Sequence, residues 1–323
     1  MHDTVQQHQP DGVPPLALTG ERTLPDVPAE NYWFRRHLAV YEWVAERCAG
    51  LEVVDMACGE GYGTDVLARR ARQVTGVDAN PEAHVHATAK YTRPGVRFAR
   101  DLIETYVQPC DAVVFLQTIE HVKEPEKVLA HFKAMAPLAF VSTPNVLTLA
   151  PAGAEKSDNP WHLREYRAEE FRALCESVFD HVEVYGLFHA RKLRAHELAL
   201  RAGWDRLHPA LKVTKPFYDR FTPAISARDF VLRRGDLDRA LDFVAVLRRA
   251  SAAGRSRWCS TRTCPTSRGS APGRSARSGC GRRSPASTCR CSTCSTGRRF
   301  RSGSRRCCAT SSRRCAARPA IAT

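Results

Sequence analysis

A short apolar run at residues 51–56 leads into a turn that carries three glycines, Gly59, Gly61 and Gly63. A strand followed by such a turn lets the backbone pass close beneath a bulky ligand, where side chains would collide. The dinucleotide-binding fingerprint needs glycine or alanine at the position of Thr64, so this turn departs from it. The pattern predicts a nucleotide-type ligand here; the alternative is that the glycines only form a tight turn.

Two aspartates stand where the next two predicted strands end. Asp78 follows the strand at 74–77, 17 residues beyond Gly61, where a carboxylate can accept hydrogen bonds from both hydroxyls of a ribose. Asp101 follows the strand at 96–98. Each has a simpler alternative, since Asp78 can be a solvated residue at a strand end and Asp101 a helix cap.

Three further residues are candidates for moving a proton. Glu120 and His121 follow the strand at 112–115, and His162 lies in the loop after the next strand. Histidine is the side chain whose ordinary pKa suits a base near neutral pH. The alternatives are structural: Glu120 and His121 can fix their loop through backbone hydrogen bonds, and His162 can anchor its loop beside Trp161.

The elements that must position these residues alternate along the chain. Helices are predicted at about 31–48, 64–72, 82–91, 125–135 and 171–178. Strands are predicted at 51–56, 74–77, 96–98, 112–115, 138–141, 181–185 and 229–232. This order predicts a doubly wound α/β fold whose mostly parallel, seven-stranded sheet is covered on both faces. Such sheets bind ligands at the carboxyl ends of their strands, where the candidate residues lie.

The composition divides the chain into three parts. Residues 1–29 are rich in Pro, Gln and Asp and are expected to form a flexible arm. Residues 30–250 are expected to form the folded domain, in which the basic, aromatic and proline-containing stretch 189–225 predicts a helical insertion. Residues 251–323 contain no Leu, Val or Met, so we expect this tail to be disordered.

The basic balance of the sequence comes from the tail. The net charge is +15, yet the residues before 251 carry 32 basic and 34 acidic side chains, while the tail has 17 Arg and no acid. The tail also holds nine of the 13 cysteines and no His, and we expect no metal site in the chain. We interpret the tail as out-of-frame translation of a GC-rich gene. The alternative is an RNA-binding arm, which the lack of aromatics between the arginines disfavours.

The sequence predicts neither secretion nor membrane insertion. No stretch approaches the ~18 apolar residues of a membrane span, and the N-terminal residues lack the apolar core of a signal peptide. Four irregularly spaced cysteines before residue 251 imply no disulfide framework. We therefore expect a cytoplasmic protein.

The sequence VVDMACGEGYG at 53–63 resembles motif I of the class I S-adenosylmethionine-dependent methyltransferases. The resemblance implies a Rossmann-like methyltransferase fold, methyl transfer, and S-adenosyl-L-methionine as cofactor. It assigns cofactor contacts to Asp55, Gly59, Gly61, Asp78, Ala79, Asp101, Leu102 and Gln117. The family usually has Glu where Gln117 stands, which alters a contact beside the methionine part of the cofactor. An NAD(P)-binding oxidoreductase is the alternative, disfavoured by Thr64.

Later motifs resemble a bacterial subgroup of this family that is often associated with polysaccharide and glycolipid assembly. They are FLQTIEHV at 115–122, VSTPN at 141–145 and NPWHLREY at 159–166, and the resemblance runs over residues 18–247. It implies O-methylation of a sugar, polysaccharide or other small-molecule acceptor. His121 is then the candidate base, Glu120 orients it or contacts the acceptor, and His162 is the second candidate base. We predict a small-molecule or glycan partner and no specific nucleic acid; the oligomeric state stays open.

The predicted first helix carries an aromatic and basic cluster with two interpretations. Its members are Tyr32, Trp33, Phe34, Arg36 and His37. In the family the N-terminal helix often covers the cofactor, which would make these residues a lid. Aromatic residues at helical spacing are also typical of a plain core.

Overall fold

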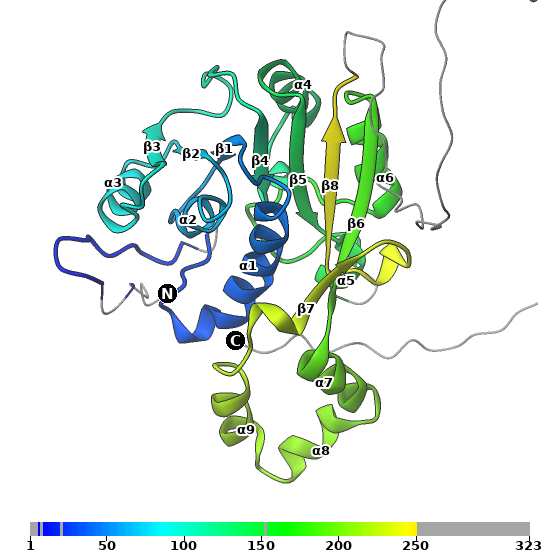
Figure 1. Cartoon of the computed structure of the whole chain (residues 1–323). Helices are drawn as coiled ribbons and strands as arrows, with labels where there is room; N and C mark the ends of the chain where they lie inside the picture. Colours follow the sequence, from blue (N-terminus) through cyan, green and yellow to red (C-terminus); the bar gives the residue numbers. More distant parts are fainter. Residues whose placement is uncertain (1–5, 7–8, 20–21, 152–153, 251–323) are drawn as a thin grey trace, which may run out of the picture. The chain divides into compact units, whose positions relative to one another are not determined.

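The computed structural model describes residues 6, 9–19, 22–151 and 154–250 (Figure 1). The tail at 251–323, and with it our interpretation of that tail, lies outside the described residues. The strands are β1 Glu52–Met56, β2 Gln73–Asp78, β3 Val96–Arg100, β4 Ala112–Leu116, β5 Leu138–Pro144, β6 His181–His189, β7 Phe230–Arg233 and β8 Asp242–Arg248. They form a sheet of order β3-β2-β1-β4-β5-β8-β6-β7. The pairs from β3 to β5 are parallel, and those involving β8, β6 and β7 are antiparallel.

Helices cover both faces of this sheet. The α-helices are α1 Asn31–Ala45, α2 Tyr62–Leu67, α3 Pro81–Lys90, α4 Pro125–Met135, α5 Val146–Leu149, α6 Ala168–Glu176, α7 Arg191–Arg201, α8 Trp204–Ala210 and α9 Thr214–Phe221. Short 3-10 helices are η1 Pro28–Glu30, η2 Ile119–His121, η3 Ala227–Asp229 and η4 Leu237–Arg239. Because neighbouring strand residues point to opposite faces, Val54 packs in the cluster with α4 and α6, while Val53 packs in the cluster with α1 and α2. The predicted doubly wound α/β fold is confirmed.

The predicted strand count of seven is wrong, because the sheet has eight strands within the described residues. The strand predicted last, at 229–232, is β7, a short edge strand paired with β6 alone. The additional strand, β8, lies between β5 and β6 and pairs with both. Its residues 242–247 are all buried, because a strand in the middle of a covered sheet has no solvent-facing side.

The stretch 189–225 contains α7, α8 and α9, which project together at the bottom of Figure 1 between β6 and β7 in the chain. Tyr218 and Phe221 of α9 pack around His196 of α7, with ring centroids 5.6 and 4.7 Å from the imidazole. Across the described residues, every helix is too short or too polar to cross a bilayer.

The N-terminal segment, here the described residues before α1, differs from the expected flexible arm. It passes beside α2 and α3 (Figure 1), and Leu16, Leu24 and Val27 form a small buried cluster of its own. Lys90 of α3 binds Asp26 at 2.7 Å and so ties the segment to the domain. The sequence did not predict this cluster, because its three apolar residues are widely spaced in a proline-rich segment and are too few to show a helical or strand period.

Candidate active site

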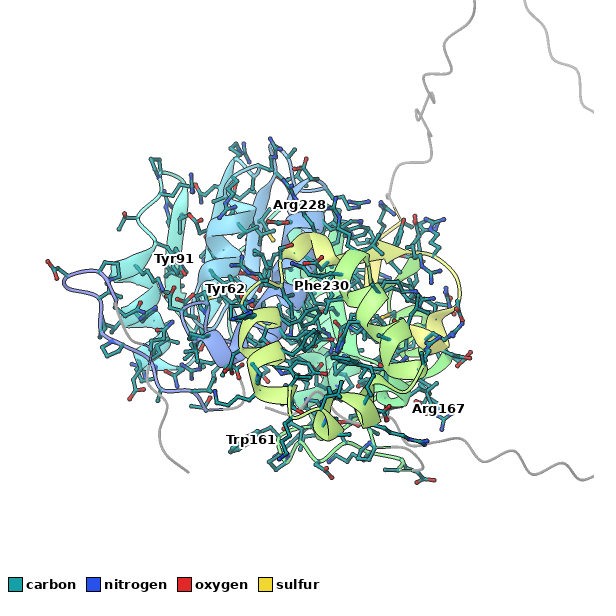
Figure 2. All side chains as sticks on the ribbon, turned by 90° about the horizontal axis from the view of Figure 1, so that it is seen from below. Tyr62, Tyr91, Trp161, Arg167, Arg228 and Phe230 are labelled. Atoms are coloured by element: carbon teal, nitrogen blue, oxygen red, sulfur yellow. The ribbon has the colours of Figure 1, made fainter. Side chains whose placement is uncertain are left out.

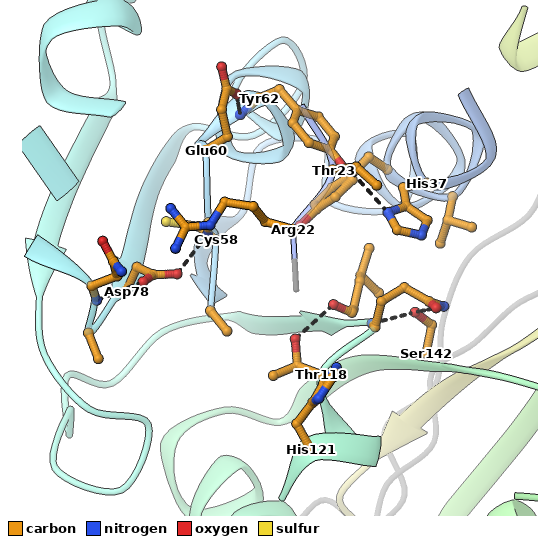
Figure 3. A pocket seen from close by; sticks show the side chains of 18 residues that line it. Arg22, Thr23, His37, Cys58, Glu60, Tyr62, Asp78, Thr118, His121 and Ser142 are labelled. Atoms are coloured by element: carbon orange, nitrogen blue, oxygen red, sulfur yellow. Dashed lines mark hydrogen bonds between the residues drawn. The ribbon is translucent and has the colours of Figure 1, made fainter. Parts of the chain in front are cut away.

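A cavity of about 320 Å³ lies at the carboxyl ends of β1, β2 and β4 (Figure 3). Its lining includes four of the predicted cofactor contacts and one predicted catalytic residue, namely Gly59, Asp78, Ala79, Gln117 and His121. The strands are parallel here, so residues that follow them in the chain meet at one edge of the sheet. The position of the cavity therefore agrees with the position expected from the order of the elements.

Asp78 holds the turns after β1 and β2 together. Its Oδ2 accepts a hydrogen bond from the backbone N–H of Gly59 at 2.8 Å, and its Oδ1 accepts one from Asn80 at 2.9 Å. A carboxylate has about four acceptor positions. These two bonds therefore orient the group while leaving capacity for the hydroxyls of a ligand in the cavity.

The three glycines of the first turn have different roles. Gly59 lines the cavity with φ +55°, and a Cβ there would meet the Arg22 Cβ at 3.9 Å. Gly61 has φ +98°, and a Cβ there would lie 2.8 Å from the Ala87 Cβ of α3. Gly63 lies against the Tyr41 ring, and a Cβ at Gly63 would lie only 2.1 Å from the Cζ of that ring. Gly59 thus forms part of the cavity wall, whereas Gly61 and Gly63 allow the turn to pack against the domain.

Asp55 lies beneath the glycine turn, fully buried, and is not among the cavity-lining residues. It accepts hydrogen bonds from the Thr64 hydroxyl at 2.7 Å and the Tyr41 hydroxyl at 3.3 Å. Burial raises the pKa of Asp55 to about 7, although both hydrogen bonds oppose that shift. Thr64 therefore has a structural purpose at the position where a dinucleotide fingerprint would need glycine or alanine.

Asp101 and Leu102 lie at the end of β3, outside the cavity lining. The Asp101 Oδ1 accepts hydrogen bonds from the Leu102 backbone N–H at 2.8 Å and from the Thr105 hydroxyl. These bonds stabilise the turn after β3, and because no helix begins at these described residues, the helix-cap alternative is wrong. The Asp101 backbone N–H donates to the carbonyl of Asp78 at 3.3 Å. Asp101 and Leu102 thus lie beside Asp78, because β3 is the neighbour of β2 in the sheet. Leu102 is 54% exposed.

Gln117 connects the ends of β4 and β5. Its backbone N–H and its side-chain Nε2 each lie 3.1 Å from the Ser142 hydroxyl oxygen, to which both donate. The residue has φ +52°, a left-handed conformation that non-glycine residues rarely adopt. Such strain is typical of functional sites, and here it places the amide on the cavity wall.

Glu120, His121 and His162 come together beside the cavity, although the two histidines are 41 positions apart in the chain. One ligand atom from each residue lies within 4.8 Å of the other two. Glu120 is buried, its Oε2 accepts from the Thr143 hydroxyl at 3.0 Å, and burial raises its pKa to about 8. The histidine rings are in edge contact, with centroids 5.0 Å apart. The structure thus unites all three predicted catalytic residues.

The loop that carries His162 is fastened to Glu120 through the backbone. The Glu120 carbonyl accepts from the N–H groups of Leu163 at 2.9 Å and Arg164 at 3.1 Å. His162 itself is buried, whereas Trp161 is 49% exposed and lies at the rim of the domain in Figure 2. The Glu120 backbone thus fixes the later loop, while the His162 ring contacts the ring of His121 and not that of Trp161.

Several lining residues were not predicted as cofactor contacts. Arg22 and Thr23 come from the N-terminal segment, and in Figure 3 Arg22 points across the cavity toward Cys58 and Asp78. Thr23 contacts the His37 Nδ1 at 3.3 Å. The sequence gives no periodic signal for Arg22 and Thr23, because both lie in irregular chain.

The predicted lid cluster of α1 is divided by the structure. His37 lines the cavity, and burial lowers its pKa to about 4. Tyr32, Phe34 and Arg36 are buried instead. The guanidinium of Arg36 binds the Asp242 carboxylate of β8 through bonds of 2.8 and 2.5 Å. Most of the cluster is therefore core, as the second interpretation expected.

Comparisons with known proteins agree with this geometry. A family model described as a methyltransferase domain matches residues 30–198. A probable S-adenosylmethionine-dependent methyltransferase of Mycolicibacterium smegmatis is 37% identical over 254 residues, 73% of this chain and 97% of that protein. One of Mycobacterium tuberculosis is 42% identical over 185 residues, 55% of this chain and 67% of that protein. A ubiquinone biosynthesis O-methyltransferase of Albidiferax ferrireducens is 33% identical over 163 residues, 42% of this chain and 63% of that protein.

Proposed function

Because this chain belongs to the S-adenosylmethionine-dependent methyltransferases, we propose that it methylates a hydroxyl group of a sugar, polysaccharide or other small-molecule acceptor. The enzyme class and the cofactor, S-adenosyl-L-methionine, follow from the family, which removes the oxidoreductase alternative. The atom that is methylated and the class of acceptor are our proposal. The cluster of Glu120, His121 and His162 beside the cofactor cavity is the observation that carries it.

The residues of the cavity fit the cofactor. The Asp78 carboxylate, oriented by two backbone N–H groups, suits the ribose hydroxyls. Gly59 and Ala79 line the adjoining wall, and Gln117 stands where we place the methionine part. We assign the adenine end to Asp101 and Leu102, which directly follow β3 and adjoin Asp78 at the end of β2. Asp55 and Gly61 contribute to cofactor binding by shaping the glycine turn. Asp55 holds Thr64 by a hydrogen bond, and Gly61 packs against α3.

His121 is suited to take a proton from an acceptor hydroxyl. The bound cofactor supplies a methyl group on a sulfonium, and a sugar hydroxyl is too weak an acid to ionise at neutral pH without a base. The His121 Nδ1 lies 2.9 Å from the Trp161 carbonyl. A carbonyl only accepts, so Nδ1 carries the proton of the neutral ring and Nε2 carries the lone pair that can accept another.

Two further observations support this function. A relative that shares part of the chain is named as an O-methyltransferase. The four cysteines of the described residues are free thiols, which supports a reducing, cytoplasmic location for the reaction. Glu120 lies next to His121 and shares its loop, so we assign it the role of positioning the base or the acceptor, with His162 as the second proton acceptor.

The test is methyl transfer from labelled S-adenosylmethionine by the full chain to a panel of sugars and oligosaccharides, with phenols and amines included. We expect label on a sugar hydroxyl. We expect His121→Ala to lower kcat by about 100-fold or more, within the usual contribution of a general base, while calorimetry with S-adenosylhomocysteine shows unchanged binding. Label only on amines would contradict the proposal, and so would a His121→Ala variant with wild-type kcat.

A further inference from the structure

We propose that Glu120, His121 and His162 bind a divalent transition-metal cation beside the cofactor cavity, and that this cation also holds the acceptor hydroxyl. The inference rests on the proposed function for the identity of the acceptor, but it replaces His121 by the cation as the group that activates the acceptor hydroxyl. The metal site itself rests only on the positions and surroundings of the three side chains.

The three side chains form a ligand set of known type. Two imidazoles and one carboxylate are the donors of many transition-metal sites that keep positions open for a substrate. The ligand atoms lie within 4.8 Å of one another, so a small inward movement brings all three to one ion. The set comes from two elements, η2 after β4 and the loop after β5, whose relative position is fixed by the backbone bonds from Leu163 and Arg164 to Glu120.

Each histidine is held through Nδ1. The Nδ1 of His121 donates to the Trp161 carbonyl at 2.9 Å, and the Nδ1 of His162 donates to the Glu165 carboxylate at 2.6 Å. A hydrogen bond from the far ring nitrogen to a carbonyl or carboxylate is the usual support of a metal-bound histidine. It fixes the tautomer so that Nε2 carries the lone pair.

Further hydrogen bonds hold the residues that contact His162. Glu165 is held by the Ser157 backbone N–H at 2.8 Å and by the Ser157 hydroxyl. The Nε2 of His162 accepts from the Asn159 side-chain amide at 3.0 Å, which identifies it as a lone-pair donor. A cation bound to His162 takes the place of that amide.

The local charge favours a cation. Glu120 is 1% exposed, and the carboxylates of Asp242 and Glu165 are close enough to interact with it electrostatically. Arg36 neutralises Asp242 by direct pairing, and the Thr143 hydroxyl is the neutral donor to Glu120. A carboxylate that is buried and ionised is stabilised by pairing with a positive charge or by binding a metal, and a divalent ion between Glu120 and the two imidazoles provides that charge.

The site gives the cation a chemical task. By withdrawing electron density from the acceptor oxygen, a bound cation lowers the pKa of the hydroxyl. The hydroxyl proton then passes to solvent water. The oxygen forms the new bond to the methyl carbon while the carbon–sulfur bond breaks, and its electron pair stays on sulfur, giving the neutral thioether product. When the cation is bound, the Nε2 of His121 is a metal ligand. The cation, and not His121 as a base, then activates the acceptor hydroxyl.

Metal binding by the full chain tests the inference. Protein freed of metal with a chelator is titrated with Mn²⁺, which suits oxygen ligands and, unlike softer metals, is not selected by the thiols of the tail. Calorimetry and the spin-resonance signal of free Mn²⁺ report binding. We expect one ion per chain, affinity weaker by tenfold or more in His162→Ala, and about 10–100-fold weaker in Glu165→Gln, the usual effect of losing outer support. His84→Ala, which removes a half-buried histidine of α3 outside the cluster, is the matched control.

The outcomes separate this inference from the proposed function. Absence of Mn²⁺ binding by the wild type, or equal binding by wild type and His162→Ala, overturns the metal site. In that case sugar methylation that persists in chelator leaves His121 as the base. Mn²⁺ binding that depends on His162 and Glu165, together with failure to methylate any hydroxyl, supports the site and overturns the acceptor. S-adenosylhomocysteine binding, measured in each variant, shows that the variants fold.

Discussion

The backbone N–H of Gly59 donates a hydrogen bond of 2.8 Å to the Asp78 carboxylate, which joins the glycine turn after β1 to the end of β2. One side chain thus both shapes the turn and presents acceptor oxygens to the cavity. The two effects act together on cofactor affinity, because loss of Asp78 removes a ligand contact and releases the turn.

Asp78→Ala is therefore expected to weaken binding of S-adenosylhomocysteine by about 10–100-fold, since a hydrogen bond to a charged group contributes about 1.5–3 kcal/mol and about 1.4 kcal/mol corresponds to tenfold. Isothermal titration measures it. Glu82→Ala, an exposed acid on α3, should leave the affinity unchanged. Equal affinities for the two variants would show that Asp78 is a solvated strand-end residue.

Gly61→Ala is expected to lower the free energy of unfolding by about 3 kcal/mol, because the new methyl group meets the Ala87 Cβ at 2.8 Å and the backbone has φ +98°. Gly203 has the same φ and nothing within 4 Å of its Cβ position. Gly203→Ala should therefore cost about 1 kcal/mol from the backbone alone. Urea unfolding of both variants separates the cost of the steric contact from the cost of the backbone conformation. Equal losses in the free energy of unfolding would show that the contact with α3 costs nothing.

Asp55 gives a prediction for pH. Its folded pKa is raised to about 7 from an ordinary value of 3.8 by burial, so the native state keeps the proton longer than the unfolded state does. The stability from this group is complete below pH 3.8 and is lost as the pH rises toward 7. Asp55→Asn should remove that loss. The free energy of unfolding of the wild type minus that of the variant should therefore fall as the pH rises from about 4.5 to about 8. Urea unfolding at the two pH values measures it; a constant difference would mean that Asp55 ionises normally.

The buried pair of Arg36 and Asp242 joins α1 to β8 with both side chains at or below 5% exposure. Arg36→Met should lower the free energy of unfolding by about 3–5 kcal/mol, because it leaves Asp242 buried and unpaired. Adding Asp242→Asn to that variant should recover part of the loss. Thermal and urea unfolding of the single and double variants test this, and a double variant no more stable than Arg36→Met would show that the unpaired charge is not the cause.

Local signals were sufficient for most elements around the site. Asn80 followed by Pro81 predicted the start of α3, and the Asn80 side chain accepts from the Ala83 backbone N–H at 2.9 Å. Apolar spacing predicted α4, whose Val128, Leu129 and Phe132 are buried. These features depend on neighbours in the chain, which is why the sequence reveals them.

Features that depend on distant contacts were missed. The run at 242–247 is fully buried, but a short apolar run does not reveal that it pairs between β5 and β6. The N-terminal segment and Arg22 became part of the site through contacts with α3 and the cavity. For Glu120, His121 and His162, the residues were predicted as candidates for catalysis, but their meeting at ligand distance follows only from the docking of the later loop on Glu120.

The position of β8 affects how the protein can be made. As the chain leaves the ribosome, β5 and β6 emerge with open edges, and each edge can recruit another nascent strand until residues 242–248 are released to fill the gap between them. Folding of this domain is thus completed late in synthesis. A change of reading frame upstream of residue 242 leaves an aggregation-prone sheet, whereas one near residue 250 spares every pair that the sheet requires.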